Sequence, residues 1–515
     1  MSNVSGIIKS IQDIMRKDVG VDGDAQRISQ LVWMFFLKIY DDREKEIELL
    51  EDEYESPIPE HLRWRNWATD DEGMTGEELN DFVNLKLFPT LKDELKVHTT
   101  SDKKEEKEKA LRALVVHEIF VDAYNYMKSG TLIRQVINKI CGIDFNNSKD
   151  RHTFGDIYEQ ILKDLQSAGN AGEFYTPRAV TKFIVNQIDP KLNESVLDPA
   201  CGTGGFLACT IDHKRNKYVK AAKDENSLIK SIHGVEKKSL PHMLCTTNMI
   251  LHGIDIPTQI EHGNTLSRRA YKDYGEKDRV EVIVTNPPFG GTEEDGVENQ
   301  FPATYRTRET ADLFMLLVIK LLTNKGRAAV VLPDGFLFGE GMKTRLKEHL
   351  LSECNLHTIV RLPNTVFAPY TGIKTNILFF EKNSQGKNKG TKDVWYYELP
   401  LPEGVKAFNK TKPMKLEHFD ACAEWWGEGK SINAKTKRKK RQENEQAWKV
   451  SIKEIIARNY NLDIKNPHVG DVISHAPEEL LADYSKQQAD IQTLRDQLKG
   501  ILAGALANNS TKGKK

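Results

Sequence analysis

Cysteine is scarce in this sequence, and long apolar runs are absent. The 515 residues contain six cysteines, none of them in C-x-x-C spacing. This argues against a zinc site or a disulfide framework and indicates a reducing compartment, the cytoplasm. No run approaches the roughly 18 apolar residues of a membrane-spanning helix. The first residues have neither a basic flank nor an apolar core, so we expect no signal peptide.

An excess of positive charge is also missing. Lys and Arg total 74 against 75 Asp and Glu, which gives a formal net charge of −1. Proteins that hold duplex DNA by themselves usually gain much of their affinity by neutralising phosphates. If this chain acts on DNA, we therefore expect a partner to share the contact. The basic run Lys435 to Arg441 fits a phosphate contact and a solvated loop or helix end equally well.

The hydrophobic pattern divides the chain into three parts. Residues 1–150 show helical spacing throughout. Between 151 and 400, short apolar strands alternate with amphipathic helices, which predicts an α/β fold with a doubly wound, mostly parallel sheet. Residues 401–515 turn mixed and then helical. The long last helix carries an apolar stripe, for packing on its own domain or on a partner, at Leu480, Leu481, Tyr484, Ile491, Leu494, Leu498 and Ile501.

A glycine-rich turn follows the first strand expected in the sheet. It reads Asp198-Pro199-Ala200-Cys201-Gly202-Thr203-Gly204-Gly205-Phe206. Its glycines permit positive φ and close approach of the backbone to a ligand. The Lys-Ser/Thr of a phosphate loop and the G-x-G-x-x-G of a dinucleotide site are both missing. Asp198 instead supplies a carboxylate suited to a cationic amine on a nucleoside-bearing cofactor; a plain strand-to-helix turn is the alternative.

A second motif, Asn286-Pro287-Pro288-Phe289, follows the apolar run Val282 to Val284. Asn286 offers a side-chain carbonyl and Pro287 a backbone carbonyl, so together they can accept both hydrogens of one planar NH2 group. This aims the nitrogen lone pair at an electrophilic methyl group while Phe289 stacks on the ring. The two motifs together predict methyl transfer from S-adenosylmethionine to an exocyclic amine. An ordinary Pro-Pro loop is the alternative.

Two further strand ends carry weaker signals. The segment His233-Gly234-Val235-Glu236 is typical of a further strand that ends in an acid, and the carboxylate of Glu236 can take both ribose hydroxyls of a nucleoside. The interval from the glycine turn is about 40 residues instead of the usual ~20. We attribute the excess to a surface insertion at Lys214 to Lys230. Asn264 is a candidate contact for the cofactor's adenine. A solvated strand-end charge and a simple Asn turn are the respective alternatives.

These motifs, in this order, resemble those of the modification subunit of type I restriction-modification systems, a family of DNA adenine-N6 methyltransferases. Further segments extend the resemblance over nearly the whole chain. They are Leu31 to Lys38, Gly172 to Arg178, Arg327 to Asp334, His357 to Pro363, Gly372 to Phe380 and Asn459 to Asp463. Cys201 is a modest departure, since relatives often have alanine there.

The resemblance implies an enzyme that methylates N6 of adenine in double-stranded DNA with S-adenosylmethionine and without a metal. The catalytic residues would be Asn286, Pro287, Pro288 and Phe289. It implies cofactor contacts at Glu173, Phe174, Tyr175, Thr176, Pro177, Arg178, Thr203, Gly204, Gly205 and Glu236, to which the analysis of the strand ends adds Asp198, Gly202 and Asn264.

The resemblance also implies partners and a division of labour along the chain. A specificity subunit would read the target sequence, with two of these chains for each specificity subunit, and a restriction nuclease-translocase would join for cleavage. Residues 1–150 would serve the DNA clamp and subunit contacts, 151–400 would form the methyltransferase domain, and the last helix of 401–515 would contact the specificity subunit.

Three other functions stay open from the sequence. The motif Asn286-Pro287-Pro288-Phe289, called the clamp below, also fits the N4 amine of cytosine and the side-chain amide of a protein glutamine, because it can hold any planar NH2 group. The third is a structural or regulatory subunit of the restriction complex, in which the cofactor binds without turnover.

Overall fold

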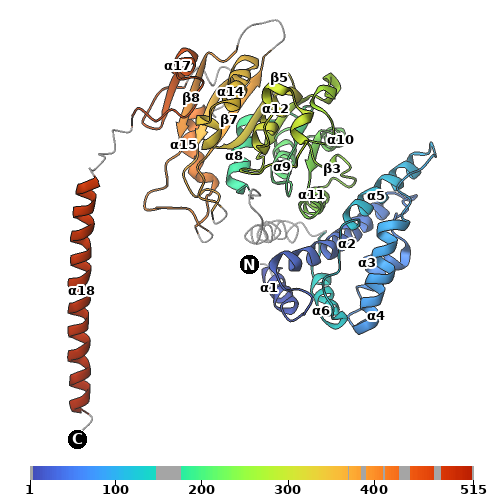
Figure 1. The fold of residues 1–515 in the computed structure, drawn as a ribbon. Helices are drawn as coiled ribbons and strands as arrows, with labels where there is room; N and C mark the ends of the chain where they lie inside the picture. Colours follow the sequence, from blue (N-terminus) through green and yellow to red (C-terminus); the bar gives the residue numbers. More distant parts are fainter. Residues whose placement is uncertain are drawn as a thin grey trace. The chain divides into compact units, whose positions relative to one another are not determined.

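The computed structural model describes residues 4–145, 176–368, 371–383, 390–409, 412–427, 441–468 and 477–512. Contacts divide the chain into two compact units, Met1–Lys465 and Asn466–Lys515. The first unit holds a helical part and a large sheet, and the second holds one long helix (Figure 1). No helix among the described residues has both the length and the apolar character needed to cross a membrane.

The helical part of the first unit covers the described residues up to 145. Its α-helices are α1 (Val4–Met15), α2 (Asp24–Leu50), α3 (Trp64–Trp67), α4 (Gly76–Asp81), α5 (Lys104–Phe120) and α6 (Gly130–Cys141). Three short helical turns lie between them, η1 (Glu60–Leu62), η2 (Phe82–Leu87) and η3 (Thr90–Glu94). The helical character expected for this part of the chain is confirmed.

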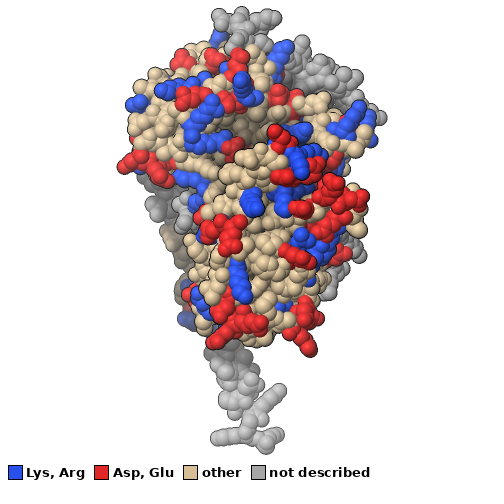
Figure 2. All heavy atoms as spheres, turned by 90° about the vertical axis from the view of Figure 1, so that its right-hand side faces the viewer, with Lys and Arg blue, Asp and Glu red and all other residues tan. Residues whose placement is uncertain are grey.

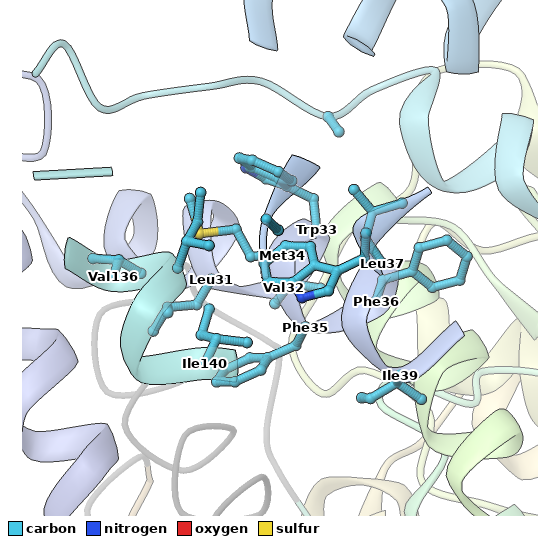
Figure 3. Packing of buried hydrophobic residues seen from close by; sticks show 14 of the residues in the cluster. Leu31, Val32, Trp33, Met34, Phe35, Phe36, Leu37, Ile39, Val136 and Ile140 are labelled. Carbon is cyan, nitrogen blue, oxygen red and sulfur yellow. The ribbon is translucent and has the colours of Figure 1, made fainter. Parts of the chain in front are cut away.

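The core of the helical part forms around the segment Leu31 to Leu37 of α2, in which every side chain is buried. A helix that is apolar on all sides is stable only when other elements surround it. Figure 3 shows this segment with Val136 and Ile140 of α6, which belong to the same buried cluster. The aromatic rings of Trp33 and Phe88 meet edge to face, with centroids 5.1 Å apart.

Nine described strands form a single sheet. They are β1 (Val196–Asp198), β2 (Ile232–Glu236), β3 (Ile260–His262), β4 (Val280–Thr285), β5 (Leu322–Pro333), β6 (Cys354–Arg361), β7 (Thr375–Lys382), β8 (Asp393–Glu398) and β9 (Ala447–Ser451). Their order across the sheet is β3-β2-β1-β4-β5-β7-β6-β8-β9. Neighbours from β3 to β5 are parallel, whereas β7 and β9 run antiparallel to the strands beside them.

The central strands of the sheet are buried on both faces. Val282 and Val284 of β4 pack into one apolar cluster, and Ile283 between them packs into another. Parallel strands covered by helices on both sides read as continuous apolar runs for this reason. The doubly wound, mostly parallel sheet expected from the sequence is therefore confirmed.

Helices connect the strands and cover the sheet. They are α8 (Arg178–Ile188), α9 (Gly205–Tyr218), α10 (Ala222–Lys230), α11 (Ser239–Leu251), α12 (Thr310–Leu321), α13 (Asp334–Phe338), α14 (Met342–Glu353), α15 (Asp420–Trp426) and α17 (Ile452–Ala457). Single 3-10 turns lie in the connections at η4 (Tyr271–Asp273), η5 (Glu276–Asp278), η6 (Val297–Gln300), η7 (Ala303–Tyr305) and η8 (Leu416–Phe419).

The stretch Lys214 to Lys230, interpreted from the sequence as a surface insertion, is mostly exposed or half-buried, but Lys214 and Leu228 within it are buried. This stretch is the end of α9 followed by α10. Lys214 is buried, and its Nζ donates to Glu194 O (2.6 Å) and Ser231 Oγ (2.7 Å). The long interval before Glu236 therefore reflects a second helix in the β1–β2 connection.

The region after residue 400 divides between the two units. Residues up to Lys465 belong with the sheet, to which they add β9 as the edge strand. The second unit contains α18 (Pro477–Lys512), whose described apolar side chains Tyr484, Ile491, Leu494, Leu498 and Ile501 are 43% to 71% exposed. The side chains of Leu480 and Leu481 lie outside the described residues.

Charged residues of both signs are mixed on the surface. The face in Figure 2 carries Lys and Arg beside Asp and Glu, in line with the net charge of −1. Of the basic run, Lys435 to Lys440 lie outside the described residues, whereas Arg441 is buried. Its guanidinium lies over the rings of Trp425 and Trp426, 4.7 and 4.1 Å from their centroids. Arg441 thus has a structural role in cation–π packing.

Candidate active site

The glycine-rich turn joins β1 to α9 and depends on backbone conformations that favour glycine. Gly202 has φ of 54° and Gly204 has φ of 81°. A Cβ on Gly204 would stand 2.8 Å from Cys245 Sγ and 3.2 Å from Met249 Cε. The turn is closed by a hydrogen bond from Gly204 N to Cys201 O (2.8 Å). The sequence therefore encodes a tight turn at this strand end, closely packed at Gly204 and open at Gly202.

The other residues of the turn hold it against the neighbouring helices. Thr203 O accepts a hydrogen bond from Asn248 Nδ2 of α11 (3.1 Å). Gly205 begins α9, and its carbonyl accepts from Arg178 Nη1 (3.1 Å). The Cys201 thiol is buried 3.7 Å from the Cys245 thiol. Its side chain therefore packs under the turn.

Asp198 ends β1 as a buried carboxyl group, 1% exposed. It accepts a hydrogen bond from Ala200 N (3.2 Å), and no described lysine or arginine forms an ion pair with it. Burial raises the pKa of this carboxyl to about 7, and the nearby Glu236 carboxylate adds to the rise. A buried acid without a cation is stabilised when a positively charged ligand group comes beside it.

Glu236 lies at the end of β2, the strand beside β1. Its Oε2 accepts from Gly202 N (2.9 Å) and its Oε1 from Lys238 N (2.8 Å). Burial raises the pKa of Glu236 as well. The two acids of the site therefore lie at adjacent strand ends, and one of them is bonded directly to the glycine turn.

The Asn286 amide leaves one acceptor without a partner. Asn286 directly follows β4, and its Nδ2 donates to Thr176 Oγ1 (2.8 Å). Its Oδ1 is shielded from solvent and has no hydrogen-bond partner among the described residues. A buried carbonyl oxygen without a donor costs about 1–3 kcal/mol, which a ligand N–H can recover.

The remaining residues of the Asn-Pro-Pro-Phe motif are largely enclosed. Pro287 is buried, Pro288 is half-buried and Phe289 is 3% exposed. Phe289 meets Phe367 edge to face, with ring centroids 6.1 Å apart at an interplanar angle of 81°. The stacking role of Phe289 stays a prediction. Phe367 was missed by the sequence analysis, although it lies between two family-like segments that were recognised.

The segment before α8 joins both motifs. Glu173, Phe174 and Tyr175 lie outside the described residues. Pro177 precedes the first turn of α8. Thr176 reaches the clamp through Asn286, and Arg178 reaches the glycine turn through Gly205. The end of this segment therefore lies between the two motifs, which are more than 80 residues apart in the sequence.

Asn264, which follows β3, already has partners for both ends of its side chain. Its Nδ2 donates to Glu293 Oε2 (3.0 Å), and its Oδ1 accepts from Leu266 N (2.9 Å). Glu293 is 7% exposed and also accepts from Thr310 Oγ1 (3.2 Å). Glu293 therefore ties the loop after the clamp to β3, a role that no motif in the sequence indicated.

The strand register brings these groups to one edge of the sheet. Leu197 pairs with His233 of β2 and with Ile283 of β4. Parallel neighbours lie about 4.8 Å apart, so the residues after β1, β2 and β4 emerge side by side. This edge is where open α/β sheets bind ligands, at the point where the strand order reverses. This edge combines the carboxyl groups of Asp198 and Glu236, the glycine-rich turn (called the glycine cradle below) and the unpaired amide oxygen of Asn286.

Comparison with known proteins supplies the family context. Residues 149–476 match the family model described as N-6 DNA Methylase, and residues 5–140 match the HsdM N-terminal domain. The chain is 62% identical over 507 residues to the type I restriction enzyme EcoEI methylase subunit of Escherichia coli, covering 98% of this chain and 99% of that one.

Solved structures agree with the sequence match. A protein described as a modification subunit of a type I restriction enzyme from Vibrio vulnificus is 41% identical, with a TM-score of 0.77 over 92% of this chain and 98% of that one. A chain from a structure of the type I R-M system is 32% identical, with a TM-score of 0.76 over 97% and 98% of the two chains.

Substitution of Gly204 tests the glycine cradle. We expect Gly204→Ala to weaken S-adenosylmethionine binding at least about ten-fold, because a side chain is strained at this φ and its Cβ meets the Cys245 thiol. Calorimetric titration of the folded variant measures the change. Gly275→Ala is the matched control, since its added Cβ meets only Asp278 Oδ2 at 3.8 Å. Equal affinities of the two variants would contradict the assignment.

The raised pKa of Asp198 predicts that cofactor affinity depends on pH. The neutral acid must ionise to hold a cationic amine, so affinity should rise as the pH climbs through about 7 and then level off. Titrations from about pH 5.5 to about pH 7.5 measure this slope, which should not exceed about ten-fold for each pH unit. Asp198→Asn should bind weakly and without that slope. The same slope in variant and wild type would rule Asp198 out as its source.

Proposed function

Because the chain belongs to the methylase subunits of type I restriction-modification systems, a family of DNA adenine-N6 methyltransferases, we propose that its described site methylates adenine N6 in double-stranded DNA with S-adenosylmethionine. A specificity subunit reads the target sequence in the assembled complex, which also accounts for the balanced charge of this chain.

The unpaired Oδ1 of Asn286 carries the proposal. Asn286 directly follows β4 at the ligand-binding edge of the sheet. Its Nδ2 already donates to Thr176 Oγ1, so Oδ1 is the atom of the amide that is left to accept a hydrogen bond. An exocyclic NH2 group supplies the missing donor, and the Pro287 carbonyl accepts the second hydrogen. Holding both hydrogens fixes the amine and directs its lone pair, which is a contribution of orientation and electrostatics.

The cofactor fits the charge of the site. When bound, S-adenosylmethionine supplies an electrophilic methyl group on a positively charged sulfonium. Asp198 and Glu236 offer two buried carboxyl groups beside the glycine cradle, and cationic groups stabilise such acids in the ionised form. We assign further contacts to Gly202, Thr203, Gly204, Gly205, Asn264 and the segment Glu173, Phe174, Tyr175, Thr176, Pro177 and Arg178.

Removal of the proton from the methylated amine does not require a strong base in the site. The amine that has received a methyl group is a strong acid, so it loses its proton without a strong base beside it. Asn286 and Pro287 remain hydrogen-bonded to the nitrogen during transfer, and Phe289 together with Phe367 limits water at the clamp. The target base must leave the helical stack to reach this site, which costs a few kcal/mol.

The stripe on α18 supports docking to a partner helix. Tyr484, Ile491 and Leu498 are seven residues apart, and Leu494 and Ile501 fill the alternate positions of the same heptads. All five side chains are exposed in a helix that is a separate compact unit. We assign this stripe to the specificity subunit, with two methylase chains for each one and a nuclease-translocase added for cleavage.

Nucleoside analysis after reaction with labelled cofactor tests the function directly. The full chain with its specificity subunit should produce N6-methyladenine in unmodified DNA, and the chain alone should not. N4-methylcytosine as the product would move the assignment to cytosine, and label in protein would move it to glutamine. A bound cofactor without any product in the full complex would support the regulatory alternative.

Substitution of Asn286 separates chemistry from cofactor binding. We expect Asn286→Ala to lower kcat for DNA methylation by about 10²–10³, the usual loss when a group that orients the reacting atoms is removed. The Kd for S-adenosylmethionine should change little, because Asn286 faces the base. Rapid-quench methylation and calorimetry measure the two quantities. Asn286→Asp, which keeps an acceptor, is the matched control; parallel loss of both quantities would refute this division of roles.

Charge placed on the α18 stripe tests subunit docking. Leu494→Asp combined with Leu498→Asp should abolish assembly with the specificity subunit, because both positions lie in the apolar seam. Cofactor binding should persist, since α18 is a separate unit. Size-exclusion chromatography of the mixed subunits measures assembly. Thr493→Asp, outside the seam on the same helix, should assemble normally. Assembly of the double variant would exclude this stripe.

A further inference from the structure

Two exposed apolar side chains lie near strand ends of the sheet. Among the described residues between 176 and 465, Phe338 is 52% exposed and Ile373 is 48% exposed, and the other exposed large apolar side chains are Ile456 (49%) and Leu416 (38%). Phe338 ends α13, which directly follows β5, and Ile373 lies two residues before β7. Pro333 of β5 pairs with Thr375 of β7, so both side chains lie at the same edge of the sheet.

Hydrogen bonds fix the backbone at the end of α13, on both sides of Phe338. The preceding residue, Leu337, is fully buried, and its carbonyl accepts from Lys347 Nζ (2.7 Å) and Leu462 N (3.0 Å). Lys347 Nζ also donates to Gly339 O (2.8 Å), although this lysine is only 1% exposed. Hydrogen bonds thus hold the backbone on both sides of an exposed phenylalanine.

α13 and the clamp follow neighbouring strands of the sheet. β4 and β5 are parallel neighbours, with Thr285 opposite Val330. Asn286 therefore emerges level with Val331, and β5 continues two residues farther before α13 begins. At about 3.3 Å for each residue, α13 starts roughly 10 Å beyond the clamp on the adjacent strand. The segment before β7 lies beside it, since Asp334 N donates to Lys374 O (3.0 Å).

A methyltransferase that acts on an adenine in a duplex needs that base outside the stack. Extrusion costs a few kcal/mol, and the opened base step loses its stacking contacts. Apolar side chains that enter such a step replace part of the lost contact area. Stacking of one base on an aromatic ring contributes about 1–3 kcal/mol. A phenylalanine whose backbone is held by hydrogen bonds at the sheet edge of the clamp has the chemistry for this task.

We propose that Phe338, at the sheet edge that also carries Ile373, enters the DNA at the target adenine and occupies the space that the extruded base leaves. The inference rests on the proposed function, because it requires a duplex whose adenine reaches Asn286. Phe338 lies at the same edge of the sheet as the clamp, on the element that follows the adjacent parallel strand.

The test compares two DNA substrates with the full chain assembled with its specificity subunit. One is the matched duplex, and the other lacks the base opposite the target adenine, so that extrusion is already favoured. We expect Phe338→Ala to methylate the matched duplex about five-fold to a hundred-fold more slowly, the range equivalent to the loss of one stacking contact. On the second substrate its rate should lie within about two-fold of wild type, and Phe338→Trp should retain activity on both.

Controls separate this role from folding and assembly. Ile456→Ala removes a side chain of similar exposure, 49%, on α17, and should leave both rates unchanged. Cofactor Kd and subunit assembly should be normal in Phe338→Ala. The proposal is overturned by a normal rate on the matched duplex, by an equal loss on both substrates, or by failed assembly. A wild-type complex that methylates neither duplex would refute the function itself, and the inference with it.

Discussion

Parallel pairing of β1 with β2 on one side and β4 on the other is the constraint on which the site depends. It brings Asp198, Glu236 and Asn286 to one edge although they are far apart in the sequence. The same pairing places the glycine turn against Glu236, whose carboxylate accepts from Gly202 N. A slip of one residue in either strand would turn alternate side chains to the opposite face. Register thus determines both the core and the chemistry.

Charge gives this edge its selectivity. Two carboxyl groups are buried close together, and burial raises the pKa of both. Such an arrangement is unfavourable in an empty site, and a positive ligand relieves it. At the end of β4, the other neighbour of β1, the requirement is reversed, because the Asn286 oxygen needs a neutral donor. One sheet edge therefore distinguishes a cation from an amine through adjacent strand ends.

Much of this arrangement was predictable from the sequence, and the limits have physical reasons. Apolar runs that end in Asp198, Glu236 and Asn286 identify strands, because buried parallel strands must be apolar on both faces. The bonds from Thr176 to Asn286 and from Asn264 to Glu293 join distant segments, so local pattern carries no sign of them. The charge of Lys214 led us to expect it on the surface, but its side chain is buried and its Nζ donates to two acceptors.

The exposed stripe of α18 affects chains that are made without enough of their partner. The stripe from Tyr484 to Ile501 extends over roughly 25 Å of the helix, at about 1.5 Å for each residue, and favours pairing with any suitable helix, including a second copy. Chains made in excess of their partner would therefore self-associate or be removed by proteolysis. In the proposed assembly, the helix would therefore couple the amount of usable methylase to the amount of its partner.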